Sequence, residues 1–541
     1  MWTAKLLLIS VAVVGPASPG FPKVIPTVGE VWPHPQMISQ GDTYMIVRPS
    51  TFKFSVTGKD CDILQEAMKR YKDIMFQSSS HLKTNPKDIW RKDEAFSGYL
   101  DTVSINLMQP CEEYPHHDMD EQYEIKIDSP DQPGEGVILA QSIWGILRGL
   151  ESFSQLLVSD GSAYQAKSTQ IRDFPRFPFR GFMLDTSRHY LPISKILEHL
   201  DLMAMNKFNV FHWHLVDDQS FPYESAVFPN LSKEGSYSSI HVYTEKNISD
   251  IVEYARLRGI RVLPEFDTPG HTMSWGPGQP GLLTTCYKDG EPDGTYGPID
   301  PTNNDNYDFL TTLFTEVTDR FHDHYIHLGG DEVSFSCWQS NPNISEFMKT
   351  HNISGEYEKL ESVYITKLIE LVSHLPNKNG YLVWQEVFDN GIQIAADTIV
   401  HIWKSETVPA GWKKEMSKVT QAGYKTVLSS CWYLNYIRYG DDWYKYYHCD
   451  PHDFEGTDAQ KQLVMGGEAC MWGEYVDGTN LIPRTWPRAS VVAEKLWSSA
   501  AQTNSTEKAV PRLEEHRCRL LDRGFRVEPL WPSFCMSDVD L

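Results

Sequence analysis

The chain has 541 residues, 41% of them hydrophobic and 12% aromatic, which is enough for a large core and more than one domain usually holds. Its formal net charge of −23 weighs against a nucleic-acid partner and against anionic membranes, because both are bound by basic patches. The 16 tryptophans indicate, besides core packing, flat apolar surfaces that suit ligands such as sugars.

The first residues have the pattern of a secretory signal peptide. Lys5 precedes the apolar run "LLLISVAVV", and small residues follow at Gly15, Ala17 and Ser18. The run is too short to span a bilayer, and no later stretch is long and apolar enough to do so. We therefore expect a signal peptide over residues 1–20 and a soluble mature protein outside the cytosol.

Sequons and cysteines fit an oxidising lumen. Five Asn-x-Ser/Thr sequons follow the leader, at Asn230, Asn247, Asn343, Asn352 and Asn504. The chain has 9 cysteines, so at least one thiol stays unpaired. We expect the disulfides Cys61–Cys111, Cys286–Cys337 and Cys518–Cys535 and a buried free Cys470, and leave the pairing of Cys431 with Cys449 open. No CxxC or Cys/His spacing predicts a zinc site.

Residues 21–170 predict a small α/β domain with an antiparallel-leaning sheet. The segments "MIVRPSTFKFSV", "YLDTVSINLM" and "EQYEIKID" alternate like half-buried strands. Helical patterns lie between them, over 61–76 and 139–158. No cluster of catalytic residue types falls in this region, so we interpret it as a packing domain.

Residues 171–541 predict a catalytic (β/α)8 TIM barrel. Eight short apolar segments read as strands, with helical patterns such as 193–205 and 250–258 between them. The eight segments are 180–188, 208–217, 259–267, 325–332, 380–387, 398–405, 424–430 and 463–472. A doubly wound open sheet is the alternative, but no GxGxxG or GxxxxGK follows a strand.

Charged or aromatic residues stand where nearly every predicted strand ends. In chain order they are Arg188; Asp217 and Asp218; Asp267 and His271; Asp331 and Glu332; Trp384 and Glu386; Trp403; Trp432 and Tyr433; Trp472 and Glu474. In a barrel these ends converge on one face, where active sites lie. Carboxylates with tryptophans at one mouth indicate a glycosidase, because carboxyl groups serve as acid and base and indole faces stack on sugar rings. A metal site is the rival interpretation, which few histidines and many aromatics disfavour.

The adjacent pair Asp331 and Glu332 in "HLGGDEV" is the candidate acid site. Glu332 is the candidate general acid, its pKa raised by an apolar pocket and a charged neighbour. A usual retaining enzyme needs a second carboxylate about 5–5.5 Å away, and consecutive strand residues point to opposite faces. Asp331 is therefore badly placed as the nucleophile. Glu386 and Glu474 are alternatives that the residues alone leave open.

Six longer motifs resemble glycoside hydrolase family 20, and within it the animal lysosomal β-hexosaminidases. They are "RGFMLDTSRHYLP", "HWHLVDDQSFPYES", "EFDTPGHTMSWG", "HLGGDEV", "VWQEV" and "GGEACMWGEYVD", and the early "VWPHPQ" extends the resemblance to nearly the whole chain. The resemblance implies an exo-acting enzyme that removes terminal β-linked N-acetylglucosamine or N-acetylgalactosamine. It also implies that the substrate's own acetamido oxygen attacks, through an oxazolinium intermediate, an exception to the two-carboxylate rule.

The resemblance assigns roles residue by residue. Glu332 matches the acid/base, Asp331 the residue that holds the acetamido nitrogen, and Tyr433 the hydroxyl donor to the acetamido oxygen. Holding a weak nucleophile in position makes it effective. The substrate-binding residues that it implies are Arg188, Asp217, His271, Trp384, Trp403, Asn435, Trp472 and Glu474. No cofactor and no metal are expected.

Within the family, the chain resembles the α type of animal subunit. "KDGEPDGTYGP" is close to the α-type loop, and Asn435 stands where the α type has asparagine. Tyr436 replaces the arginine that the α type sets against anionic substrates, and tyrosine offers a hydrogen bond but no charge. The resemblance implies a lysosomal enzyme, a homodimer or a heterodimer with a β-type subunit, and GM2 ganglioside with its activator protein as partners.

Two other functions fit parts of the sequence. A retaining glycosidase with its own carboxylate nucleophile predicts efficient cleavage of a 2-deoxy substrate without the acetamide. A non-catalytic carbohydrate-binding protein predicts sugar binding without turnover, which the intact acid pair disfavours.

Overall fold

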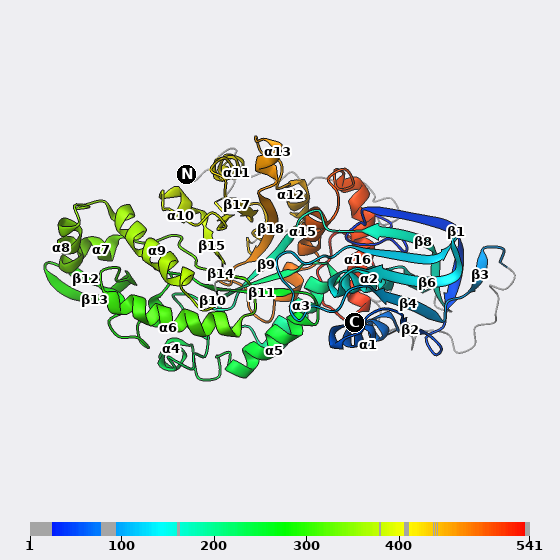
Figure 1. Cartoon of the computed structure of the whole chain (residues 1–541), viewed down its shortest axis with the longest axis horizontal. Helices are drawn as coiled ribbons and strands as arrows, with labels where there is room; N and C mark the ends of the chain where they lie inside the picture. The colour runs from blue at the N-terminus through cyan, green and yellow to red at the C-terminus, as the bar shows by residue number, and fades with distance from the viewer. Residues whose placement is uncertain are drawn as a thin grey trace, which may run out of the picture.

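The computed structural model describes residues 24–76, 93–159, 163–377, 380–404, 411–436, 438, 440 and 442–535, so the expected signal peptide lies outside them. Two sheets organise the chain (Figure 1): an N-terminal mixed sheet and a closed barrel. In the described residues no helix is long and apolar enough to cross a membrane.

The N-terminal sheet has the order β2-β4-β6-β5-β8-β1-β3, with β7 paired to β8. Four of its strand pairs are antiparallel and three parallel, as the alternating segments predicted. Its strands are β1 (Met37–Val47), β2 (Lys53–Val56), β3 (Phe96–Tyr99), β4 (Thr102–Leu107), β5 (Tyr123–Ser129), β6 (Gln132–Ala140), β7 (Leu157–Ser159) and β8 (Tyr164–Asp173). Strand β8 runs to Asp173 within this sheet, past residue 170, where we expected the N-terminal domain to end.

Helices α1 (Asp62–Phe76) and α2 (Ile143–Gln155) pack against each other, and α2 contacts β5 and β6. The prediction of a helix from residue 139 is wrong for its first residues, because Leu139 and Ala140 finish β6. Ser142 then caps α2, its hydroxyl accepting from the backbone N–H groups of Trp144 and Gly145. Every residue of α2 is buried, so this helix is the centre of the domain.

The predicted (β/α)8 barrel is confirmed, with eight parallel strands closed in the order β9-β10-β11-β14-β15-β16-β17-β18. The strands are β9 (Phe179–Asp185), β10 (Val210–Val216), β11 (Arg261–Phe266), β14 (Tyr325–His327), β15 (Gly380–Trp384), β16 (Ile399–Ile402), β17 (Lys425–Leu428) and β18 (Val464–Met471). Seven lie within the expected segments, and β9 begins one residue before its segment, 180–188. The hairpin β12 (Leu283–Lys288) and β13 (Glu291–Ile299) lies outside the barrel, at the end of the molecule away from the N-terminal sheet (Figure 1).

Helices surround the barrel. They are α3 (Ile193–Met205), α4 (Asn230–Gly235), α5 (Glu245–Arg256), the 3-10 turn η3 (Met273–Trp275), α6 (Asn304–Arg320), α7 (Ser336–Ser340), α8 (Pro342–Thr350), α9 (Tyr357–Ser373), α10 (Gln385–Asp389), α11 (Gly411–Gln421), α12 (Trp443–His448), α13 (Asp458–Lys461), α14 (Leu481–Thr485), α15 (Arg488–Trp497) and α16 (Thr506–Asp522). The last helix, α16, lies toward the N-terminal domain, and Arg523 just after it pairs with Glu151 of α2 at 2.9 Å.

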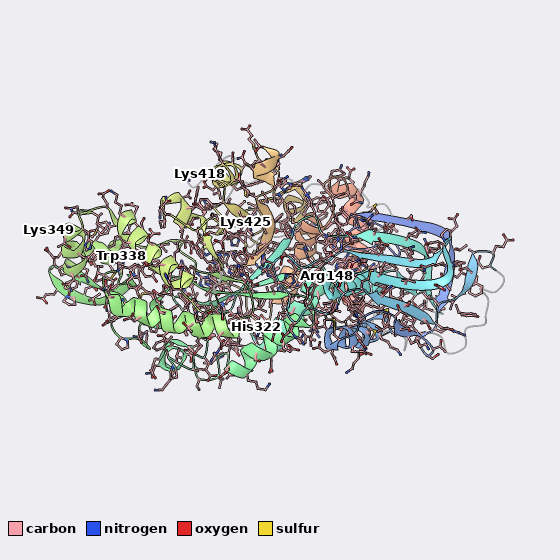
Figure 2. The ribbon with its side chains drawn as sticks, in the orientation of Figure 1. Arg148, His322, Trp338, Lys349, Lys418 and Lys425 are labelled. Carbon is pink, nitrogen blue, oxygen red and sulfur yellow. A yellow bond between two sulfur atoms is a disulfide. The ribbon has the colours of Figure 1, made fainter. Side chains whose placement is uncertain are left out.

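A buried cluster of permanent charges joins the two domains. Arg148 of α2, labelled in Figure 2, and Arg180 of β9 both bind Glu121, at 2.8 and 2.5 Å. Arg148 also donates to the backbone carbonyl of Gly259, just before β11, at 2.8 Å. We call Glu121, Arg148 and Arg180 the junction cluster. It fixes the N-terminal domain against the starting ends of the barrel strands.

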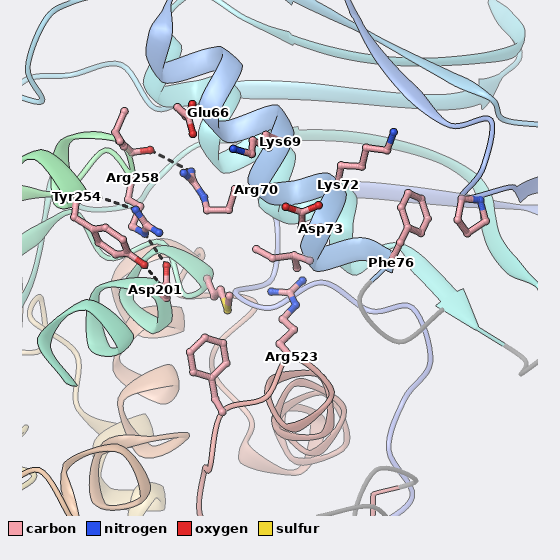
Figure 3. Close-up of a pocket in the computed structure, with 15 residues that line it drawn as sticks. Glu66, Lys69, Arg70, Lys72, Asp73, Phe76, Asp201, Tyr254, Arg258 and Arg523 are labelled. Atoms are coloured by element: carbon pink, nitrogen blue, oxygen red, sulfur yellow. Dashed lines mark hydrogen bonds and ion pairs between the residues drawn. The ribbon is translucent and has the colours of Figure 1, made fainter. Parts of the chain in front are cut away.

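A cavity of about 830 Å³ lies at the same junction, between α1, α3, α5 and the segment after α16 (Figure 3). Two of its arginines are engaged: Arg258 donates to Asp201 at 2.7 Å, and Arg70 donates to the Leu257 carbonyl at 3.1 Å. Leu257 and Arg258 directly precede β11, so the cavity lies at the end of the barrel opposite the mouth, where residues serve stability.

The three predicted disulfides Cys61–Cys111, Cys286–Cys337 and Cys518–Cys535 are present, and Cys431 is bonded to Cys449. Cys470, at the end of β18, is free and fully buried, as expected. It packs with Met183 and Tyr433, directly behind the barrel mouth.

Candidate active site

Four aromatic side chains from consecutive strands form a wall at the mouth. Trp384 ends β15, and Trp403, Tyr433 and Trp472 follow β16, β17 and β18. Ring centroids of Trp403 and Tyr433 lie 6.3 Å apart, those of Tyr433 and Trp472 6.5 Å, and those of Trp384 and Trp472 6.1 Å. Burial raises the pKa of Tyr433 well above its usual range, so its hydroxyl stays a donor. Flat apolar rings around one hydroxyl suit a sugar ring.

The acid pair lies on a loop, not on a strand, which corrects the expectation of a strand over 325–332. Strand β14 ends at His327, and Gly329, Gly330 and Glu332 have φ values of 67°, 97° and 51°. These left-handed conformations suit glycine. The alternation of strand side chains therefore does not apply to Asp331 and Glu332. The loop buries Asp331 and leaves the side chain of Glu332 58% exposed.

Asp267, which follows β11, shapes this loop. Its Oδ1 accepts a hydrogen bond from the Gly330 backbone N–H at 2.8 Å, and a Cβ on Gly329 would lie 1.7 Å from the same oxygen. Burial and the charge of Asp331 raise the pKa of Asp267 well above its usual range. Asp267 therefore keeps its proton and can donate it in a hydrogen bond to Asp331. Within the described residues Asp331 Oδ1 is buried and has no hydrogen-bond partner, which leaves it free for a ligand.

His271 joins the acid loop to Asp217. Its Nδ1 donates to Asp217 Oδ1 at 3.1 Å, and its Nε2 lies 3.8 Å from Glu332 Oε2 and 3.9 Å from Asp331 Oδ2. Burial alone would lower the pKa of His271, but the hydrogen bond with Asp217 and the charge of Asp331 raise it to about 9. An imidazolium thus stands beside both residues of the acid pair.

Arg188 stands on the other side of Asp217. Its guanidinium pairs with Asp217 at 2.7 Å and Asp185 at 2.9 Å, and it lies over the Trp472 ring at 4.9 Å. His214 and His271 outweigh the effect of burial and hold the pKa of Asp217 well below its usual range. Asp217 therefore stays ionised and connects the arginine at the aromatic wall to the acid loop.

The remaining predicted residues lie at the rim or beside the wall. Asn435 is half-buried, and among the described residues its Oδ1 has no hydrogen-bond partner. Glu474 is exposed two residues after Trp472. Glu386 accepts from Trp403 Nε1 at 2.8 Å, and burial together with the charge of Asp331 raises its pKa to about 7. Glu386 is thus a neutral carboxylic acid under acidic conditions and a poor nucleophile there.

Comparison with known proteins decides the family. Residues 177–500 match the model described as glycosyl hydrolase family 20, catalytic domain, and residues 31–156 match the model described as beta-acetyl hexosaminidase like. The chain belongs to glycosyl hydrolase family 20. It is therefore a glycoside hydrolase of the β-hexosaminidase family.

Individual relatives agree over nearly the full length. The chain is 48% identical over 517 residues to the β-hexosaminidase subunit α of Bos taurus, covering 94% of this chain and 96% of that one. It is 47% identical over 511 residues to the β-hexosaminidase subunit β of Homo sapiens, covering 93% and 89%. A chitobiase structure from Flavobacterium johnsoniae, 30% identical, superposes with a TM-score of 0.78 over 92% of this chain and 73% of that one. The resemblance to family 20 is confirmed.

Beneath this family 20 site, several buried polar residues lie inside strands, where the prediction from strand ends did not look. They are Asp185 of β9, His212 and His214 of β10, Glu265 of β11, His327 of β14, His401 of β16 and Glu468 of β18. The signal was present: "FHWHLV" and "LPEF" carry polar residues within runs that are otherwise apolar and fully buried. A charged residue in such a run must find a partner inside the barrel.

Hydrogen bonding accounts for the groups of residues that could in principle hold a metal. Among the described residues three such groups occur: His212, His327 and His401; Asp217, Asp218 and His271; and Asp267, His271 and Asp331. His212 Nδ1 binds Glu468 at 2.8 Å, and His327 Nδ1 accepts from the Gly329 N–H at 3.1 Å. His271 is held by Asp217.

Proposed function

We propose that this family 20 enzyme is an exo-acting β-N-acetylhexosaminidase that removes terminal β-linked N-acetylglucosamine or N-acetylgalactosamine with retention of configuration. The observation that carries the proposal is the division between the acid pair: Asp331 is buried with a free Oδ1, while Glu332 is exposed at the same loop. One carboxyl can hold a group of the bound sugar while the other reaches the leaving group.

The proposed mechanism uses the substrate as nucleophile. Asp331 Oδ1 accepts the acetamido N–H, and the Tyr433 hydroxyl donates to the acetamido oxygen, which aligns that oxygen with the anomeric carbon. Glu332 donates its proton to the leaving oxygen, and the oxazolinium intermediate is then opened by water that Glu332 deprotonates. The His271 imidazolium beside Glu332 stabilises the carboxylate that forms after proton donation.

The variant Glu332→Gln tests the acid assignment. Loss of the general acid should lower kcat on a poor leaving group, such as an N-acetylglucosamine disaccharide, by about 10²–10⁴-fold. An aryl glycoside with a good leaving group should lose less. Glu346→Gln, an exposed glutamate of α8, is the matched control and should keep full activity. Full activity of Glu332→Gln on the disaccharide would remove the assignment.

The rival mechanism, with an enzyme carboxylate as nucleophile, has Glu386 as its strongest candidate. The raised pKa of Glu386 and its hydrogen bond from Trp403 support a wall-positioning role instead. A 2-deoxy glycoside without the acetamide separates the two. Efficient cleavage of that substrate would favour Glu386 and contradict the substrate-assisted route.

For specificity we propose preference for neutral glycoconjugates. Tyr436 is 52% exposed and stacks on Tyr433 at 5.9 Å, so next to the acetamide position this side chain offers an aromatic face and no positive charge. Kinetics on neutral and 6-sulfated N-acetylglucosaminides test this, and Tyr436→Arg should raise the sulfated-to-neutral ratio of kcat/KM. An unchanged ratio would show that Tyr436 does not determine the preference for neutral over sulfated substrates.

The wider setting is also proposed from the relatives. They are named as subunits, which supports a dimer, with itself or with a β-type subunit, and a lysosomal destination through the secretory route. Glycoproteins with neutral termini are the proposed preferred substrates, and GM2-type glycolipids presented by an activator protein and glycosaminoglycans, which are anionic, are proposed as slower substrates. The sequon residues Asn230, Asn343, Asn352 and Asn504 are exposed and Asn247 is half-buried, which supports glycan attachment at the first four.

A further inference from the structure

Beneath the sugar site, the barrel interior holds a fully buried set of ionisable side chains. They are His212, His214, Glu265, His327, His401 and Glu468, which we call the barrel cluster. Barrel interiors are usually filled with branched apolar residues, and buried charges are costly unless paired. Two questions follow: how these residues are paired, and what the pairing holds in place.

Glu265 is the central residue of this cluster, because its two carboxylate oxygens bind different partners. Oε2 accepts from His214 Nδ1 at 2.6 Å and lies 3.0 Å from His212 Nε2. Oε1 accepts from the indole Nε1–H of Trp384 at 2.8 Å. One side chain of β11 therefore holds both a histidine of β10 and a wall residue of β15.

His214 connects Glu265 to Asp217 at the sugar site. Its Nε2 donates to Asp217 Oδ2 at 2.7 Å, so one imidazole is held between two carboxylates. Burial alone would lower the pKa of His214, but Glu265 and Asp217 raise it to about 10. Among the described residues, Glu265, Asp217 and the edge-on Trp472 ring, 4.9 Å away, contact His214. Asp185 is its register partner on β9, and Arg188 shares Asp217 Oδ2 with it. His214 is therefore a cation at any working pH, and Asp217 is fixed as an anion.

His327 and His401, two further histidines of the cluster, are neutral. Burial lowers the pKa of His327 and of His401, and His327 Nδ1 accepts from the backbone N–H of Gly329 at 3.1 Å. His327 Nδ1 also lies 3.2 Å from Glu265 Oε1. Because its Nδ1 lone pair accepts from Gly329, neutral His327 has no proton on this nitrogen to donate to Glu265, so this contact is not one of the arms of the coupling.

We propose that Glu265 is the positioning residue of the sugar site, coupling the aromatic wall to the acid side through two separate arms. One arm is the direct bond to Trp384. The other arm runs through His214 to Asp217, which in turn fixes Arg188 and His271. The inference rests on the proposed function, since the arms end on residues that the family resemblance assigns to sugar binding. Glu265 itself touches no substrate.

The variant Glu265→Gln tests the coupling, because it keeps the size of the side chain and removes its charge. One amide oxygen cannot serve His214 and Trp384 together, so both arms loosen. We expect kcat/KM on p-nitrophenyl N-acetyl-β-glucosaminide to fall by about 100-fold, since small misplacements at a site carry losses of that order. The loss should appear in KM as well as kcat, and the affinity for free N-acetylglucosamine, read from tryptophan fluorescence, should fall too.

Glu468→Gln is the matched control. Glu468 is the other buried carboxylate of the cluster and binds His212 at 2.8 Å, but no contact in the described residues joins it to Asp217 or Trp384. Both variants should lower the melting temperature. Only Glu265→Gln should weaken N-acetylglucosamine binding and shift the kcat/KM–pH profile, because only there does His214 lose one of its two carboxylates. Equal kinetic losses in the two variants, or wild-type affinity in Glu265→Gln, would overturn the proposal.

Two further measurements keep the test decisive. If Glu265→Gln does not fold, a double-mutant cycle of Asp217→Asn and Trp384→Phe measures the same coupling, and strictly multiplicative losses of sugar affinity would contradict it.

Wild-type turnover is measured first. An inactive wild type that still binds N-acetylglucosamine would refute the proposed function, while the fluorescence comparison would still decide the role of Glu265.

Discussion

Two buried charge clusters of this molecule differ in the chemistry of their cations. The junction cluster sets two arginines, Arg148 and Arg180, on Glu121 between the domains. The barrel cluster sets two protonated histidines, His212 and His214, on Glu265 beneath the mouth. Arginine cannot lose its proton in a protein, whereas histidine can. The molecule thus has permanent cations at the domain junction and titratable cations beneath the sugar site.

The junction cluster should be the more costly of the two to break. Arg180→Met leaves Glu121, which is fully buried, with one cation in place of two, and breaking such a pair costs about 3–5 kcal/mol. Chemical denaturation measures the loss. Arg172→Met is the control, since that arginine is exposed and 3.8 Å from Glu124, and it should change the free energy of unfolding by less than about 0.5 kcal/mol. Similar losses in both variants would mean that the junction cluster adds no stability.

Asp217, where the barrel cluster meets the site, should affect catalysis more than folding. Asp217→Asn removes the anion shared by Arg188, His214 and His271, and the pKa of His271 should fall from about 9. We expect kcat/KM to drop about 100-fold, equivalent to about 2.7 kcal/mol, with its alkaline limb moved to lower pH. Asp218→Asn, the neighbouring carboxylate, is the control and should keep the wild-type profile. A drop without any change of pH profile would contradict the link to His271.

The pH dependence of stability should distinguish the two clusters. The folded-state pKa of His212 is raised to about 9 and that of His214 to about 10, above the unfolded value of about 6.5. Their contribution is therefore complete below about pH 6.5 and is lost as the pH rises towards 9–10, by at most about 1.4 kcal/mol per pH unit for each histidine. A cluster held by arginine is expected to show no such slope, because arginine stays protonated in proteins.

Denaturation at pH 6, 7.5 and 9 measures this slope. In His212→Gln one titrating group is gone, so stability should be lower at pH 6 but should fall less between pH 6 and 9 than in the wild type. Parallel curves for the two proteins would show that His212 does not carry its charge in the folded state.

An exposed ion pair should contribute the least to the free energy of unfolding. Lys246 pairs with Asp250 one turn along α5 at 2.7 Å, with the lysine side chain 79% exposed. Such pairs contribute about 0.3–0.5 kcal/mol, so Lys246→Ala should change the free energy of unfolding by no more than that, and high salt should abolish the difference. A loss above about 1 kcal/mol would show that burial is not what separates the clusters from the surface.

The barrel could be predicted because buried parallel strands are continuous apolar runs, and all eight such segments hold a strand. The turn of the acid loop could not be predicted from strand alternation. It depends on Gly329 and Gly330, which leave the strand early and pass against Asp267. The glycine pair was the available signal for a break after His327.

The strand-end rule predicted a converging set of polar residues, and the structure brings Asp217, His271 and Arg188 together. It could not predict the buried residues that hold them in place. His214 and Glu265 are 51 residues apart in sequence, and their contact depends on β10 lying beside β11 in the closed barrel. Polar residues within an apolar run show that a buried partner exists, but only the strand order shows which one.

Cys470 has a consequence for handling the protein. Its thiol is sealed behind Tyr433 at the end of β18, and burial raises its pKa well above the usual range, so the folded enzyme presents no reactive thiolate there. Each opening of the barrel exposes it. A thiol-specific label added under native conditions therefore counts opening events over time, and gives each variant above a folding lifetime that does not depend on its activity.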